Sequence, residues 1–83
     1  PNPFQNTVKF EIDLESTADV KVVVYDFLGK KLSSNQYRNL SSGKQVITID
    51  SVSGDGFELP PGVYLSEIYV DNVPAQVVKL IKQ

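Results

Sequence analysis

The stretch TVKFEIDLESTADVKVVVYDF, residues 7–27, holds the two patterns that decide the fold class. In residues 7–14 every second side chain is apolar, and the side chains between them are polar or charged. Alternation with period two puts the apolar side chains on one face, which is typical of a half-buried β-strand. The predicted inward side chains are Val8, Phe10, Ile12 and Leu14.

Residues 19–27 are rich in valine, and the apolar side chains occupy both faces. One face carries Val20, Val22 and Val24. Val23 and Tyr25 add apolar surface to the other face. Because β-branched residues favour strands and both faces are apolar, this segment is predicted to be a central strand of a sheet.

Four more segments with strand-like patterns follow along the chain. The predicted strands are residues 30–40, 45–50, 63–70 and 75–81. Their candidate core side chains are Leu32, Tyr37, Leu40, Ile47, Ile49, Tyr64, Ile68 and Val70. In the last strand, the pair Val78 and Leu80 competes with Val77 and Ile81 for the inward face, and the pattern leaves both registers open.

Turn-forming residues separate these segments. Asp26 and Gly29 lie between the second and third predicted strands. Pro61 and Gly62 fit a type II turn, in which proline sets φ and glycine takes a positive φ. The Asp-Asn dipeptide at residues 71–72 predicts a two-residue hairpin with a primed turn.

Short strands separated by turns, without an amphipathic helix, predict an all-β fold. We expect an immunoglobulin-like β-sandwich of about seven short, mainly antiparallel strands. Cysteine and tryptophan are absent from the 83 residues, so the disulfide and core tryptophan of antibody domains are excluded. A chain of this length is expected to form one domain, residues 1–83.

Charge and composition narrow the range of functions. The net charge is −2, from 8 basic and 10 acidic residues, which argues against a nucleic-acid partner. No apolar run approaches the roughly 20 residues that cross a bilayer, so no membrane-spanning segment is expected. Because the sequence starts with Pro1 and contains no methionine, we interpret it as a fragment of a larger secreted precursor.

The sequence gives little support to catalysis, and we expect no enzyme. Without histidine or cysteine, a serine nucleophile lacks its usual base. Ser42 and Lys44 could form a Ser-Lys pair, but a lysine beside a turn serine is more often a solvated surface residue. The carboxylates Glu11, Asp13 and Glu15 invite a glycosidase interpretation. However, the first two belong to the outer face of a predicted strand, where solvated charges are the rule.

No cofactor and no metal are expected. Residues 50–56 include a Gly-Asp-Gly sequence, but a calcium loop needs several acidic ligands, and serines occupy two of the positions here. We therefore predict a turn, and weak calcium binding by Asp50 and Asp55 stays open. The glycine-rich segments are not followed by a helix whose N-terminus could bind phosphate.

Five motifs stand in order along the whole chain. They are PNPF at residues 1–4 followed by TVKFEI at 7–12, ADVKVVVYD at 18–26 followed by LGK at 28–30, LSSGK at 40–44, PGVYL at 61–65 and KLIKQ at 79–83. Together they resemble the type A C-terminal sorting domain of the type IX (Por) secretion system. The matching positions are Pro1, Asn2, Pro3, Phe4, Tyr25, Asp26, Gly29, Gly43, Gly62, Val63, Tyr64, Lys79, Leu80, Ile81, Lys82 and Gln83. Two departures, Pro60-Pro61 before Gly62 and the composition of residues 51–59, lie in a loop region.

The resemblance implies a function in protein secretion. Members of this family stand at the end of cargo proteins that reach the periplasm by general export. They direct the cargo across the outer membrane through the type IX machinery, and a sortase-like surface peptidase typically removes them. The implied partners are an N-terminal cargo domain, the outer-membrane machinery and the peptidase. The implied location is secreted or cell surface, by way of the periplasm.

A folded sorting signal needs an exposed feature that its partner recognises. We place this feature in residues 79–83, where Lys79 and Lys82 are expected to present positive charge on an acidic domain. The edge of a terminal strand can also accept a partner by strand addition. The alternative is that these lysines only keep an edge strand soluble. The other motif residues are assigned to structure first, with Pro3 fixing the start of the first strand and Phe4 covering one end of the sandwich.

Two other functions are compatible with a small β-sandwich. One is a carbohydrate-binding or adhesive module, which would need a row of exposed aromatic side chains. Tryptophan is absent, and Tyr69 is the aromatic residue expected to face outward. The other is a passive spacer domain, which predicts no partner and full tolerance of changes in the C-terminal residues.

Overall fold

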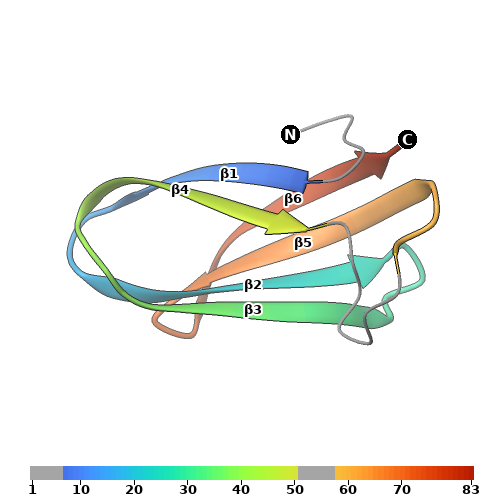
Figure 1. Ribbon diagram of the computed structural model, residues 1–83. Coiled ribbons are helices and arrows are strands. Elements are labelled where there is room, and N and C mark those ends of the chain that lie inside the picture. Colours follow the sequence, from blue (N-terminus) through green and yellow to red (C-terminus); the bar gives the residue numbers. More distant parts are fainter. Residues whose placement is uncertain (1–6, 51–57) are drawn as a thin grey trace.

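The computed structural model describes residues 7–50 and 58–83, which contain six β-strands. They are β1 Thr7–Leu14, β2 Ala18–Asp26, β3 Lys31–Leu40, β4 Gly43–Asp50, β5 Gly62–Val70 and β6 Val73–Lys82 (Figure 1). Every strand pairing is antiparallel. The predicted all-β fold is confirmed, and each predicted strand is present with its ends moved by at most two residues.

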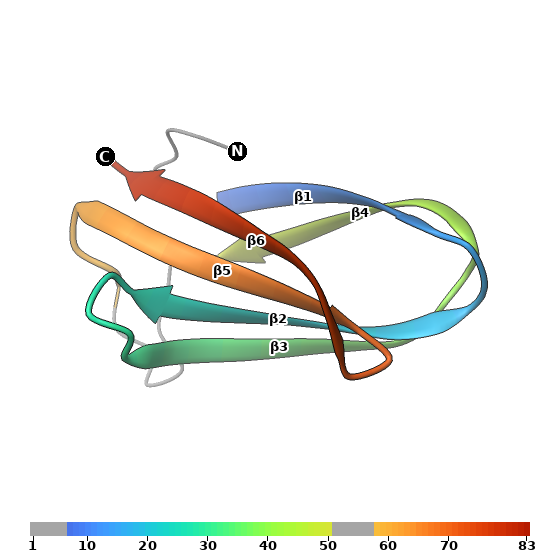
Figure 2. The same ribbon diagram turned by 180° about the vertical axis from the view of Figure 1, so that it is seen from behind.

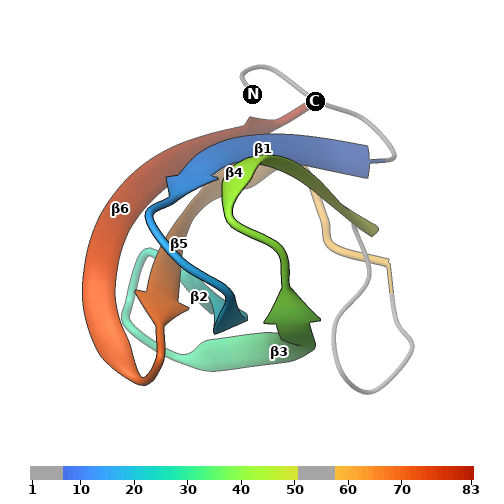
Figure 3. The same ribbon diagram turned by 90° about the vertical axis from the view of Figure 1, so that its left-hand side faces the viewer.

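The strands form two sheets that face each other. β1 and β4 make a two-stranded sheet, and the other four strands make a sheet in the order β3-β2-β5-β6. Figure 3, seen along the strands, shows the two sheets as opposite layers of a sandwich. The prediction that the Val-rich strand is central is confirmed, because β2 pairs with β3 on one side and with β5 on the other.

The core lies between the two sheets and is built mostly by alternating side chains. β1 buries every second residue, as its pattern predicted. Val20, Val22 and Val24 of β2 face β1 and β4 across the core, while Val23 is buried on the outer face of the larger sheet. The remaining core members are Ala18, Ile47, Ile49, Leu59, Tyr64, Ile68 and Leu80. The predicted residues Leu32, Tyr37, Leu40 and Val70 are partly buried against this cluster.

The structure settles the register of β6. Leu80 belongs to the core and Val78 packs against it, whereas Val77 and Ile81 are exposed. The antiparallel pairing explains this choice, because Leu80 lies opposite buried Tyr64 of β5 and Ile81 lies opposite exposed Val63.

Two turn predictions have different outcomes. Asp71 and Asn72 take φ values of 49° and 65°, which confirms the primed hairpin turn. Gly62 has the expected positive φ, but its value of 157° differs from the roughly +80° of a type II turn, so the turn type was wrong. Gly62 is already the first residue of β5.

Leu59, which the sequence placed in the loop before β5, is a core residue that the pattern missed. It lies outside any alternating run, so no periodicity marked it for burial.

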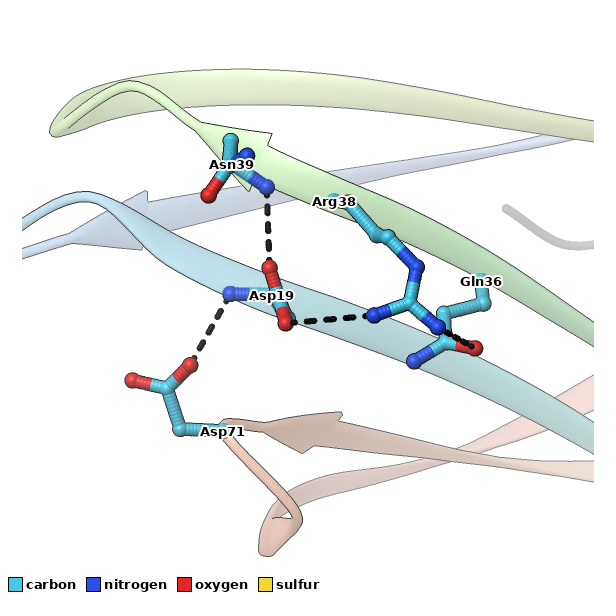
Figure 4. A network of polar contacts seen from close by, with 5 residues as sticks. All are labelled: Asp19, Gln36, Arg38, Asn39 and Asp71. Carbon is cyan, nitrogen blue, oxygen red and sulfur yellow. Dashed lines mark hydrogen bonds and ion pairs between the residues drawn. The ribbon is translucent and has the colours of Figure 1, made fainter.

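Asp19 connects three parts of the fold at the end that carries the β5–β6 hairpin (Figure 4). Its Oδ1 accepts a hydrogen bond of 2.9 Å from the Asn39 N–H, and its Oδ2 lies 3.8 Å from Nη1 of Arg38. These contacts hold β3 where its register with β2 shifts between Ala18 and Val20. Asn39 has a φ of 55°, so the carboxylate stabilises a backbone conformation that most residues avoid.

Candidate recognition surface around β6

β6 forms one edge of the four-stranded sheet and ends at the same end of the sandwich at which β1 begins (Figure 2). The sequence placed its candidate recognition residues here, in residues 79–83. The structure divides them by side-chain direction. Leu80 and Lys82 face inward, and Lys79, Ile81 and Gln83 are exposed.

The expectation that Lys82 presents positive charge to a partner is wrong. Its side chain is only 7% exposed, and its Nζ lies 3.7 Å from Oε1 of Glu58. Lys82 follows Leu80 by two positions and so shares its inward face, where its aliphatic stem can cover the edge of the core. Glu58 comes from the segment before β5 and was not singled out by the sequence.

Lys79 and Ile81 lie on the outer face of the larger sheet, together with apolar side chains from two strands. We define the β5–β6 face by the exposed residues Val63, Leu65, Val77, Lys79 and Ile81. Lys79 is paired with Leu65, and Ile81 with Val63. Lys79 and Ile81 each also take part in an interaction with another residue.

Polar groups cluster at the centre of the same outer face. Tyr69 donates a hydrogen bond to Oε1 of Glu67, and Nζ of Lys21 lies 4.6 Å from the centre of the Tyr69 ring. The hydrogen bond to Glu67 raises the pKa of Tyr69, and burial raises it further. The expectation that Tyr69 faces outward is confirmed.

The turn between β2 and β3 explains the matching positions Asp26 and Gly29. Oδ1 of Asp26 accepts hydrogen bonds from the N–H groups of Leu28, at 3.0 Å, and Lys30, at 2.8 Å. Gly29 has a φ of 91°, a value that side-chain-bearing residues rarely adopt. Tyr25, the preceding motif residue, is half-buried on the outer face. Asp26 and Gly29 therefore build the turn, in line with a structural role.

In the motif at the start of β5, Tyr64 also has a structural role. Tyr64 is buried in the core, and its hydroxyl donates a hydrogen bond to the carbonyl oxygen of Pro60. Burial raises the pKa of Tyr64, and the nearby Asp26 carboxylate adds to this effect. Gly43 has a φ of 100° and begins β4. In contrast, Val63 points outward and belongs to the β5–β6 face.

Some predictions fall on residues that the structure does not describe. Pro1, Asn2, Pro3 and Phe4 lie outside the described residues, and so does the possible calcium loop after Asp50. Within 7–50 and 58–83, no three carboxylate, histidine or cysteine side chains gather into a group that could hold a metal ion. In the same part of the chain, no helix has the length and apolar character needed to cross a membrane.

Comparisons with known proteins identify a family and a similar part of a solved structure. The chain matches the family described as "Secretion system C-terminal sorting domain" over residues 1–83. It is also similar to a part of the crystal structure of dimeric latent PorU from Porphyromonas gingivalis, with a TM-score of 0.81 and 27% sequence identity. That similarity covers 99% of this chain and 8% of the PorU chain. No curated protein matches the sequence.

Proposed function

Because the chain belongs to the secretion system C-terminal sorting domain family, we propose that it carries a cargo protein at its N-terminal side and is recognised through the outward side chains of β6. Membership makes the domain a type IX secretion signal, which directs export to the cell surface or the medium by way of the periplasm. In the proposed sequence of events, the outer-membrane machinery recognises the folded domain, and a sortase-like surface peptidase then separates it from the cargo.

The distribution of side chains on β6 supports this choice of surface. Lys79 and Ile81 are exposed, and Val63, Leu65 and Val77 add exposed apolar side chains on the same face. Apolar side chains on a rigid sheet lose little conformational entropy on binding, and a lysine beside them adds a specific polar contact. Leu80 and Lys82 fix the strand from the inward side, so we assign them to positioning and not to contact with the partner.

A secretion assay tests the proposal. The 83 residues are fused behind an exported fluorescent reporter and expressed in a bacterium with a working type IX system and in a strain without it. We expect reporter outside the cell only in the first strain. Lys79→Glu and Ile81→Ser should retain the reporter in the periplasm, because they change the charge and the apolar surface of the β5–β6 face.

Matched variants on the other sheet control for general effects of the substitutions. Lys9→Glu and Val46→Ser change an exposed lysine and an exposed apolar residue of β1 and β4, and we expect normal secretion from both. Normal secretion of the Lys79→Glu and Ile81→Ser variants would show that another surface is recognised. If the unchanged fusion stays in the periplasm of both strains although the domain is folded, the proposal that the domain directs the export of a fused cargo is contradicted.

A further inference from the structure

The β2–β3 turn holds two large apolar side chains in the solvent. Phe27 is 71% exposed and Leu28 is 83% exposed, which makes them the two most exposed large hydrophobic residues in the described part of the chain. The turn lies at the end of the sandwich opposite the β5–β6 hairpin (Figure 1). Contiguous exposed apolar surface, unlike scattered single side chains, is a feature of interaction sites.

The turn is held in one conformation by its own hydrogen bonds. Besides the two bonds to the Asp26 carboxylate, the Asp26 N–H donates to the carbonyl oxygen of Lys30 at 2.9 Å, and the Gly29 N–H donates to that of Asp26 at 3.0 Å. The chain therefore does not need to order this segment when Phe27 and Leu28 contact a partner, which lowers the entropic cost of binding.

Positive charge follows directly after the two apolar side chains. Lys30 and Lys31 are exposed, and neither forms an ion pair with any other residue in 7–50 and 58–83. Other basic residues are paired with carboxylates, namely Arg38 with Asp19, Lys44 with Glu11 and Lys82 with Glu58. The carboxylate of Asp26, the nearest acidic group in the sequence, is turned onto the backbone of the turn. The tip thus carries two lysines available to an anionic partner.

We propose that this turn docks on an anionic lipid surface, with Phe27 and Leu28 inserted among the acyl chains and Lys30 and Lys31 at the headgroup phosphates. An apolar tip followed by cationic side chains matches the order in which a bilayer presents headgroups and hydrocarbon. The aliphatic stem of a lysine can lie beside the acyl chains while its ammonium group stays among the headgroups, so both parts of each side chain are in a suitable environment. Phe27 and Leu28 also line a hollow with Pro61, Gly62 and Val63, and a protein partner at this surface is the alternative that the vesicle measurements test.

Two measurements on the isolated 83-residue chain test the proposal without any secretion machinery. Because the chain contains no tryptophan, Leu28→Trp introduces a unique fluorophore at the tip. Its emission should shift to shorter wavelength with vesicles of phosphatidylcholine and phosphatidylglycerol, and much less with phosphatidylcholine alone. Val73→Trp, at a 62% exposed position in the β5–β6 hairpin, should not respond to either vesicle.

Flotation with the same vesicles separates the apolar from the charged contribution. The double variant Phe27→Ser/Leu28→Ser should lose at least about tenfold in vesicle affinity. Lys30→Gln/Lys31→Gln should lose roughly thirtyfold, at about 1 kcal/mol per lysine at an anionic surface. Val73→Ser and Lys9→Gln should bind as the unchanged chain does, and added salt should weaken binding.

The outcomes distinguish this inference from the sorting function. Absence of a tip-specific fluorescence shift, or equal losses in the tip and control variants, would overturn lipid docking. A protein contact at the tip would give neither the shift nor flotation with protein-free vesicles, and it would overturn the proposal in the same way. Because vesicles are the probe, failure of the secretion assay leaves this result unaffected, and failure of vesicle binding leaves the secretion assay unaffected.

Discussion

Asp19 and Asp71 are joined by two hydrogen bonds across 52 residues of sequence. The Asp71 N–H donates to the carbonyl oxygen of Asp19 at 2.8 Å, and the Asp19 N–H donates to Oδ1 of Asp71 at 2.9 Å. The pair ties the beginning of β2 to the turn between β5 and β6 (Figure 4). Since the Asp19 carboxylate also holds Asn39 of β3, one residue connects β2 to both neighbouring segments of the sheet.

Removing the Asp71 side chain should weaken this connection measurably. Asp71→Gly keeps the positive φ of the turn but leaves the Asp19 N–H without its acceptor, so we expect a loss of about 1–2 kcal/mol in the free energy of unfolding. Asp71→Asn retains an oxygen acceptor and a residue that tolerates positive φ, and should stay close to the unchanged protein. Urea unfolding of both variants checks the expectation, and equal stability of the two would contradict it.

Ser66 should be a destabilising residue in the core. It is fully buried on the inward face of β5, opposite Val24 and Val78, and its Oγ has no hydrogen-bond partner in the described part of the chain. Burying a hydroxyl without a partner costs free energy that alanine does not incur. Ser66→Ala is expected to raise the free energy of unfolding by about 1 kcal/mol. Ser34→Ala, at an exposed position of β3, is the control and should change little, while a less stable Ser66→Ala protein would show that the hydroxyl is satisfied.

The buried Lys82 side chain predicts an asymmetry between two substitutions. Glu58→Gln removes the negative charge that faces the Lys82 ammonium, so the buried cation loses its partner. We expect a loss of about 1–2 kcal/mol, limited by the exposure of Glu58. Lys82→Met removes the cation itself and keeps an apolar stem of similar length, so it should cost less. Thermal unfolding of the two variants tests the order, and a larger loss in Lys82→Met would contradict the role given to the pair.

Alkaline pH should destabilise the fold through its tyrosines. Burial raises the pKa of Tyr37 and Tyr64, and the hydrogen bond to Glu67 raises the pKa of Tyr69. A raised pKa in the folded state means that the fold favours the neutral phenol. The resulting stability is fully present below the unfolded pKa of about 10 and is lost as pH rises through the folded pKa.

The measurement is the free energy of unfolding as a function of pH above about 9. In Tyr64→Phe, the free energy of unfolding should fall less steeply with rising pH than in the unchanged protein, because one phenol no longer ionises on unfolding. An unchanged slope in this variant would show that Tyr64 does not contribute to the pH dependence. The two proteins are compared by the slope of unfolding free energy against pH. The constant loss of stability that follows from removing the hydrogen bond to Pro60 does not change this slope.

Local patterns predicted most of the strands because each pattern depends only on neighbouring residues. The alternation in β1 placed Val8, Phe10, Ile12 and Leu14 in the core, and all four are buried. The Asp-Asn dipeptide predicted its primed turn because positive φ is a property of the two residues themselves. The motifs at both ends and in the middle of the chain also indicated the family, which the match over residues 1–83 confirms.

The surface that we propose for recognition was less predictable, since it depends on which face of β6 meets the core. Both Val78 with Leu80 and Val77 with Ile81 form an apolar row, so hydrophobicity alone cannot choose between them. The choice follows from pairing with β5, and it carries Lys82 inward and Lys79 outward. A lysine is almost never fully buried unless it is paired, and the Glu58 carboxylate supplies the partner for Lys82.

The sequence by itself determined the fold class, the strands, the hairpin turn and the family, because these follow from period-two alternation, backbone preferences of single residues and motif order. The tertiary structure alone decided the direction of each β6 side chain, the burial of Leu59 and Lys82, and the connection of Asp19 to Asp71 and Asn39. The physical reason is that these features are set by contacts between segments far apart in the chain, whose free energy depends on register and on how the sheets pack.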